Sequence, residues 1–189
     1  MRASDTSRLA ALLLMGSPLR VLHFAPEPFL ESRLRRVPRM RLVTVDLEDP
    51  RADVRADIVD LPFEDGEFDL ILCSHVLEHV PDDRRGMKEL RRVLAPSGVA
   101  IVQSPVNYDQ NGTFEAPQET NPEERLKLFS QRDHVRVYGP DLKDRLENAG
   151  FRVGIRAYAE EVDPRVAAQC GLVPEAEPLR NDLYVCRAG

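Results

Sequence analysis

The stretch Phe68-Asp-Leu-Ile-Leu-Cys-Ser74 decides the fold class. Its apolar residues run almost without interruption, and a turn sequence at residues 64–66 precedes them. This pattern is typical of a central strand in a parallel sheet, because such a strand is buried on both faces. Further strand candidates are residues 19–24, 41–46, 56–59, 99–103, 151–157 and 182–187.

Helical stretches alternate with these strand candidates. The sequence predicts helices over residues 27–36, 82–94, 122–129 and 140–149. Asp82 is a residue type that caps helix N-termini, and Gly150 stands just past the last helix. The alternation predicts an α/β fold with a doubly wound sheet. Ligands bind beyond the carboxyl ends of the strands in such sheets, so the site is expected there.

The chain of 189 residues is long enough for one domain, which we expect to span residues 1–189. Residues 1–18 are expected to form a short helical cap, and residues 104–139 an insertion on the substrate side. The apolar run at residues 9–15 is too short to cross a membrane and favours an amphipathic helix.

The composition favours a cytoplasmic location. The three cysteines, Cys73, Cys170 and Cys186, are few and unclustered, which is typical of free thiols in a reducing compartment. The net charge of −6 argues against a dedicated nucleic-acid binder.

Two carboxylates lie within strand candidates at positions suited to a nucleoside. Asp46 ends the second strand, about 20 residues after the first strand–helix turn, where nucleoside-binding folds place an acid that accepts both ribose hydroxyls. The carboxylate of Asp57 can accept from an exocyclic amine, while the backbone of Ile58 faces a base edge.

An ordered set of motifs begins at Asp57. It consists of Asp57-x-x-Asp-Leu-Pro-Phe63, Asp65-Gly-x-Phe-Asp-Leu70, Ser74-His-Val-Leu-Glu-His-Val80 and Glu89-Leu-Arg-Arg-Val-Leu-Ala-Pro-x-Gly98. Together they resemble the class I S-adenosylmethionine-dependent methyltransferases, in particular the type 11 group, over roughly residues 19–157. The resemblance implies a Rossmann-like, seven-stranded sheet with an antiparallel last strand, and S-adenosylmethionine as the cofactor. Ser74 and His75 would line the methyl-donor pocket.

The loop after the first strand departs from the family pattern. The family usually has Asp-x-Gly-x-Gly-x-Gly, whereas this chain has His23-Phe-Ala-Pro-Glu-Pro-Phe29 and no glycine between Gly16 and Gly66. S-adenosylmethionine carries no phosphate that must be wrapped by backbone N–H groups. Ala25 is small enough for close approach, and Glu27 can receive the α-ammonium. The variant string also resembles one that recurs within the group, so His23, Ala25 and Glu27 are assigned to the cofactor.

The segment at residues 129–139 places titratable side chains where a substrate lid is expected. His134 is our first candidate for a substrate base, followed by His75 and Tyr108. An alternative is a connector whose polar groups satisfy its own backbone. Substrate contacts are expected from Asn107, Arg136 and Tyr138.

His75-x-x-Glu78-His79 also spells the inverted zinc-peptidase motif. That site would need an established helix and a further acidic ligand, whereas the motif directly follows a predicted buried strand. We therefore expect no metal.

Two functions remain open at this point. The first is methyl transfer to a small metabolite, sugar or peptide, most simply at oxygen or nitrogen. We expect no nucleic-acid or membrane partner for such an enzyme, and the chain could form a homodimer. The alternative is a non-catalytic partner or cofactor-binding protein that kept the fold. Methyl transfer to a substrate would distinguish them.

Overall fold

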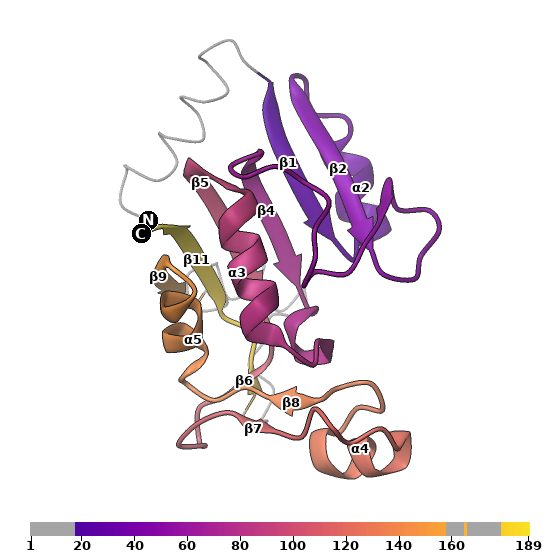
Figure 1. Cartoon of the computed structure of the whole chain (residues 1–189), viewed down its shortest axis with the longest axis vertical. Helices are drawn as coiled ribbons and strands as arrows, with labels where there is room; N and C mark the ends of the chain where they lie inside the picture. Colours follow the sequence, from indigo (N-terminus) through magenta and orange to yellow (C-terminus); the bar gives the residue numbers. More distant parts are fainter. Residues whose placement is uncertain (1–17, 158–164, 166–178) are drawn as a thin grey trace.

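The computed structural model describes residues 18–157, 165 and 179–189. Its centre is a seven-stranded sheet with the order β3-β2-β1-β4-β5-β11-β9 (Figure 1). The strands are β1 (Leu19–Phe24), β2 (Met40–Asp46), β3 (Val54–Arg55), β4 (Phe68–Ser74), β5 (Leu94–Gln103), β9 (Phe151–Arg156) and β11 (Leu183–Ala188).

Strand β11 runs antiparallel to both β5 and β9, and the remaining pairs are parallel. The predicted α/β sheet with an antiparallel last strand is therefore confirmed. From β1 the chain builds outward to β2 and β3, and then returns to place β4 on the other side of β1. This reversal opens a crevice at the carboxyl ends of β1 and β4, where doubly wound folds bind ligands.

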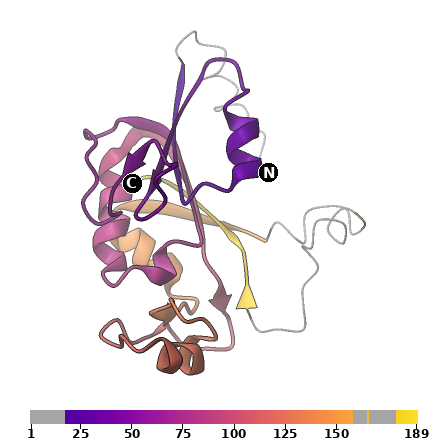
Figure 2. The ribbon, with the colours of Figure 1, turned by 90° about the vertical axis from the view of Figure 1, so that its right-hand side faces the viewer.

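Helices cover both faces of the sheet, with α2 (Pro28–Leu34) on one side and α3 (Asp83–Val93) and α5 (Leu142–Asn148) on the other (Figure 2). The spacing of apolar residues in α3 explains its orientation. Met87, Leu90 and Val93 recur every three residues and are completely buried, so one face of α3 packs into the core. Asp82 accepts a hydrogen bond from the Arg85 N–H, as expected of an N-cap.

A smaller layer lies beyond the carboxyl ends of the central strands (Figure 1). It contains β6 (Val106–Asn107), β7 (Phe114–Glu115), the helix α4 (Pro122–Phe129) and β8 (Arg136–Val137). Strand β7 pairs with β8, and β6 pairs with β10 (Leu179–Arg180). The sequence predicted α4 with the observed bounds but missed the two-residue strands, which are too short to show periodicity.

The predicted strand over residues 56–59 is wrong, because the strand lies at Val54–Arg55. Asp57 breaks the extended conformation: its Oδ1 accepts from the Val59 N–H at 3.1 Å, and its carbonyl accepts from the Asp60 N–H at 3.0 Å. An aspartate that hydrogen-bonds the backbone two residues on favours a turn over a strand.

Several expectations fall outside the described residues. They are the helix at residues 9–15, nearly all of the cap over residues 1–18, and Cys170. Cys73 and Cys186 are buried free thiols. Within residues 18–157 and 179–189, no helix is both long and apolar enough to span a bilayer.

Gly139 and Gly112 meet so closely that a side chain cannot be added between them. A Cβ on Gly139 would lie 2.5 Å from the Gly112 carbonyl carbon, and neither backbone can move aside cheaply. We expect Gly139→Ala to lower the free energy of unfolding by about 1–3 kcal/mol, measured by denaturant titration. The matched control is Gly154→Ala in β9, where a Cβ meets nothing within 4 Å. Equal stability of the two variants would contradict this packing.

Candidate functional site

A cavity of about 500 Å³ opens at the carboxyl ends of β1, β2 and β4. Five residues that the sequence assigned to the cofactor line it: Ala25, Asp46, Asp57, Ile58 and His75. Its size lies within the range of small-molecule and cofactor sites. His23, Glu27 and Ser74 are not among the lining residues. The Ser74 hydroxyl instead lies 3.0 Å from Gln103 Oε1.

The two acids of the cavity are held by their own backbone. Asp46 Oδ1 accepts from the N–H groups of Glu48 and Asp49, both at 2.8 Å. Asp57 Oδ1 accepts from the N–H of Val59. Each pairing uses one carboxylate oxygen and fixes the direction of the other, so both acids are preorganised to accept hydrogen bonds from a ligand.

The backbone is strained at two residues that line the cavity. Ala25 directly follows β1 with φ of 44°, and His75 directly follows β4 with φ of 53°. A side chain in this left-handed region costs of order 1–3 kcal/mol, and such residues cluster at functional sites. Hydrogen bonds from the Ala25 N–H to Val45 O and from the His75 N–H to Gln103 O, both 2.9 Å, hold the two turns.

A histidine–glutamate pair stabilises the loop that lacks glycine. His23 is buried, and its Nε2 lies 2.9 Å from Oε2 of the half-exposed Glu27. Glu27 is the residue before α2, so the pair ties the end of β1 to the start of that helix. The Nδ1 atom of His23 is buried without a hydrogen-bond partner. The loop thus uses side chains where the family pattern would use glycine.

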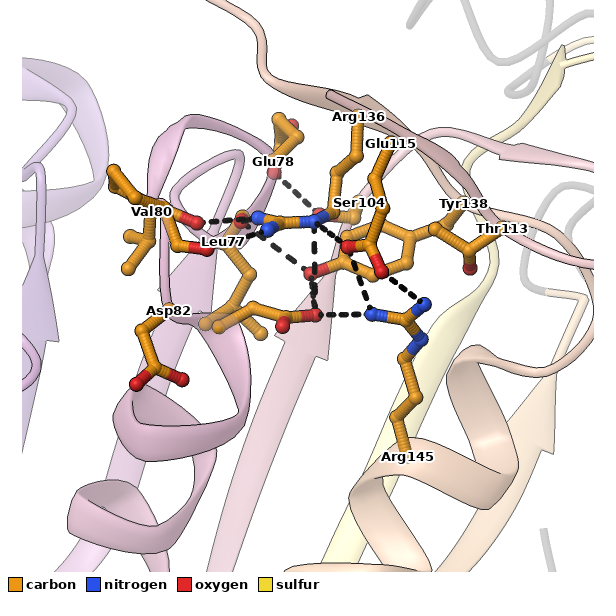
Figure 3. Close-up of polar contacts among 12 residues, drawn as sticks. Leu77, Glu78, Val80, Asp82, Ser104, Thr113, Glu115, Arg136, Tyr138 and Arg145 are labelled. Atoms are coloured by element: carbon orange, nitrogen blue, oxygen red, sulfur yellow. Dashed lines mark hydrogen bonds and ion pairs between the residues drawn. The ribbon is translucent and has the colours of Figure 1, made fainter. Parts of the chain in front are cut away.

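A buried carboxylate orients His75. Glu78 is 1% exposed, and its Oε1 lies 3.2 Å from His75 Nδ1. Its Oε2 accepts a hydrogen bond from the Ser104 hydroxyl (Figure 3). Burial alone would raise the pKa of Glu78, but these two hydrogen bonds outweigh it, and the pKa lies below its ordinary value. The hydrogen bond with Glu78 raises the pKa of His75.

His134 lies against His79, with ring centroids 4.7 Å apart in an edge-to-face arrangement. His79 Nδ1 also lies 3.3 Å from Asp133 Oδ2, and both of these residues line the cavity. Burial lowers the pKa of the half-buried His134, and the neighbouring His79 lowers it further. The structure therefore brings His134 to the rim of the cavity, although it is not a lining residue.

Arg136 and Tyr138 do not lie at the cavity, where the sequence predicted substrate-binding residues. Both are buried, and neither lines the cavity. The guanidinium of Arg136 donates to the carbonyls of Leu77, Val80 and Pro81 (Figure 3).

The two side chains also meet the acids of α3 and β7. The Tyr138 hydroxyl donates to Asp83 Oδ2 at 2.8 Å, and Arg136 pairs with Asp83 and with Glu115. Arg145 of α5 binds the same two acids (Figure 3). This cluster attaches β7 and β8 to α3 and α5. The alternative of a connector that satisfies its own backbone does not describe Arg136 and Tyr138 either, because their partners lie in other segments of the chain.

Tyr108 and Asn107 also lie outside the cavity lining. The Tyr108 hydroxyl donates to Asp182 Oδ2 at 2.8 Å, and burial raises the pKa of Tyr108. Asn107 Oδ1 accepts from the Asp109 N–H at 2.9 Å. Both side chains are therefore engaged within the protein.

Three residues were not assigned to the site from the sequence. His79 and Asp133 line the cavity, and the acid Glu78 has its Oε1 3.2 Å from His75 Nδ1. The His75-x-x-Glu78-His79 string singled out two of them, but for a helical zinc site. The structure excludes that helix, because Leu77–His79 is one turn of 3-10 helix, η1, and His75 lies before it with a left-handed backbone.

Residues 27–102 match the family model described as "Methyltransferase domain", which confirms the resemblance stated above. Tocopherol O-methyltransferase of Arabidopsis thaliana is 51% identical over 47 residues, covering 25% of this chain and 14% of that enzyme. A probable S-adenosylmethionine-dependent methyltransferase of Mycolicibacterium smegmatis is 32% identical over 105 residues, covering 55% of this chain and 37% of that protein. The chain therefore spans well under two thirds of these relatives.

Similarity in structure extends over nearly the whole chain. The crystal structure of an S-adenosylmethionine-dependent methyltransferase from Mesorhizobium loti superposes with a TM-score of 0.63 at 16% identity and 98% coverage of both chains. At this identity the likeness establishes the fold.

Because Arg136 is buried, its replacement should destabilise the fold far more than replacement of an exposed arginine in the same segment. Removing its charge takes the buried guanidinium from the carbonyls of Leu77, Val80 and Pro81 and removes one of the cations paired with Asp83. We therefore expect Arg136→Met to cost about 3–5 kcal/mol in denaturant titrations. Arg132 forms an exposed pair with Glu123, and Arg132→Met should change stability by no more than about 0.5 kcal/mol. An Arg136→Met protein as stable as the parent would contradict the structural role.

Proposed function

We propose that this chain, whose residues 27–102 match the methyltransferase-domain family model, transfers the methyl group of S-adenosylmethionine to a small metabolite, sugar or peptide. The observation that carries the proposal is the cavity at the β1–β4 reversal, where Asp46 and Asp57 present fixed carboxylates. A doubly wound sheet binds nucleosides at that point.

The nucleoside half of the cofactor would lie along the ends of β2 and β3. Asp46 would accept from both ribose hydroxyls, and Asp57 from the exocyclic amine of adenine. Ile58 is buried at the cavity wall, so its backbone can face the base edge while its side chain supplies apolar contact.

The methionine half would lie at the loop after β1. The left-handed turn at Ala25 brings the backbone close to the ligand without a large side chain. Glu27 would receive the α-ammonium, with His23 as the residue that positions its carboxylate at 2.9 Å. Because His23 is buried and Glu27 half exposed, the carboxylate is anchored on one side and open on the other.

The chemistry requires little beyond alignment. The sulfonium methyl is already electrophilic, so the protein must hold the nucleophile in line and exclude water. A base is needed where the nucleophile carries a proton. Among the three candidate bases His75 is the one that lines the cavity, so we assign it that role, for transfer to oxygen or nitrogen.

Calorimetric titration with S-adenosylmethionine tests whether the chain binds the cofactor at all. Absence of binding at millimolar cofactor would overturn the proposal. Asp46→Asn tests the ribose contact, because the amide oxygen can keep the hydrogen bonds from Glu48 and Asp49 while the charge is lost. We expect the Kd for S-adenosylhomocysteine to rise about tenfold or more. Asp60→Asn, an exposed acid of the neighbouring turn, is the control and should leave the Kd within about twofold.

Glu27→Gln tests the ammonium contact. We expect it to weaken binding of S-adenosylhomocysteine about tenfold, and to leave binding of 5′-methylthioadenosine unchanged, because that nucleoside lacks the amino-acid end. Calorimetry with the two ligands measures both effects. Equal losses for both ligands would show that Glu27 acts through the loop structure, and no loss for either would show that it does not contact the cofactor.

A further inference from the structure

We propose that Glu78, His79 and His134 form a divalent-metal site at the rim of the cofactor cavity. One ligand atom of each residue lies within 4.8 Å of the others. The residues come from two segments distant in sequence, η1 and the chain before β8, so local sequence proximity does not explain their meeting.

The donor set fits a transition metal. Two imidazoles and one carboxylate are the ligands that zinc takes in many open sites, and cobalt and iron accept them as well. Tetrahedral zinc with bonds of about 2.0–2.1 Å needs donors roughly 3.4 Å apart, so the three side chains must close by about 1 Å or less per group. His134 and His79 are only partly buried, which leaves their rings free to make this adjustment.

Groups around the three residues hold them in the way that metal ligands are held. Asp133 Oδ2 lies 3.3 Å from His79 Nδ1, which leaves His79 Nε2 as the donor to a metal. A carboxylate behind a ligating histidine fixes its ring and raises its basicity. Ser104 restrains the carboxylate of Glu78.

The backbone also joins the two segments. The Val135 N–H donates to the Glu78 carbonyl at 2.9 Å, directly beside His134. Glu78 is buried, so its carboxylate stays at the site.

This site differs from the one that the His-x-x-Glu-His string spells. His75 Nδ1 lies 3.2 Å from Glu78 Oε1, but His75 does not belong to the ligand cluster. His134 takes its place, and therefore acts as a ligand and not as the base suggested by the sequence.

Resting on the proposed function, the site also indicates a substrate class. Three protein ligands leave at least one coordination position open, and His79 lines the cavity. A substrate that carries a hydroxyl or a carbonyl oxygen could occupy that position and be aligned with the methyl donor. The metal would thus select an oxygen-bearing substrate.

Cobalt titration tests the ligand set without reference to activity. The full chain is stripped of metal with a chelator and titrated with Co²⁺, and visible d–d absorption is recorded, with Zn²⁺ as competitor. We expect one equivalent to bind and His134→Gln to lower the affinity about 100-fold, while His75→Gln, the matched control, lowers it less than about tenfold. Absence of cobalt absorption, or a larger loss in His75→Gln than in His134→Gln, would overturn the proposal.

Two further measurements separate this proposal from the proposed function and from misfolding. The metal-free parent and His134→Gln should bind S-adenosylhomocysteine with equal affinity, which would show that the cavity of the variant is intact. If the parent does not bind S-adenosylhomocysteine, the result contradicts the proposed methyltransferase function and leaves the metal site to the cobalt titration. Acetohydroxamate added to the cobalt protein supplies oxygen donors and should shift the absorption bands. Unchanged bands would refute the open position and the substrate class.

Discussion

The pairing of β1 with β4 is the constraint on which the rest of the structure depends. These strands lie side by side although residues 25–67 separate them, and the chain leaves β1 toward β2 but returns to β4 on its other side. The reversal prevents either crossover from covering the strand ends. The cavity, its two acids and the strained turns at Ala25 and His75 all follow from this arrangement.

Under the proposed function, the loop after β1 would receive a ligand that carries no phosphate, although the loop contains no glycine. The turn after β1 keeps a left-handed backbone, but an alanine adopts it, and a His23–Glu27 pair joins strand and helix in place of a run of backbone amides. The strained alanine costs of order 1–3 kcal/mol, and a hydrogen bond to a charged group contributes a similar amount, about 1.5–3 kcal/mol. The exchange is therefore energetically modest, and it suits an ammonium better than a phosphate.

Much of the fold could be predicted from the sequence because β4 and α3 carry strong local signals, a continuous apolar run and a buried stripe with an N-cap. Asp46 and Asp57 were found because strand ends converge in this topology. Burial of polar groups could not be predicted in the same way. Arg136 and Tyr138 carry functional groups typical of a site, yet their partners Asp83 and Leu77 lie more than fifty residues away.

A crystal structure of the chain grown with S-adenosylhomocysteine tests the central claim most directly. The account predicts density for the ligand in the cavity between β1 and β4, with its ribose hydroxyls on Asp46, its adenine edge beside Asp57 and Ile58, and its amino group toward Glu27. Ligand bound elsewhere, or a cavity that stays without ligand at saturating concentration, would contradict it.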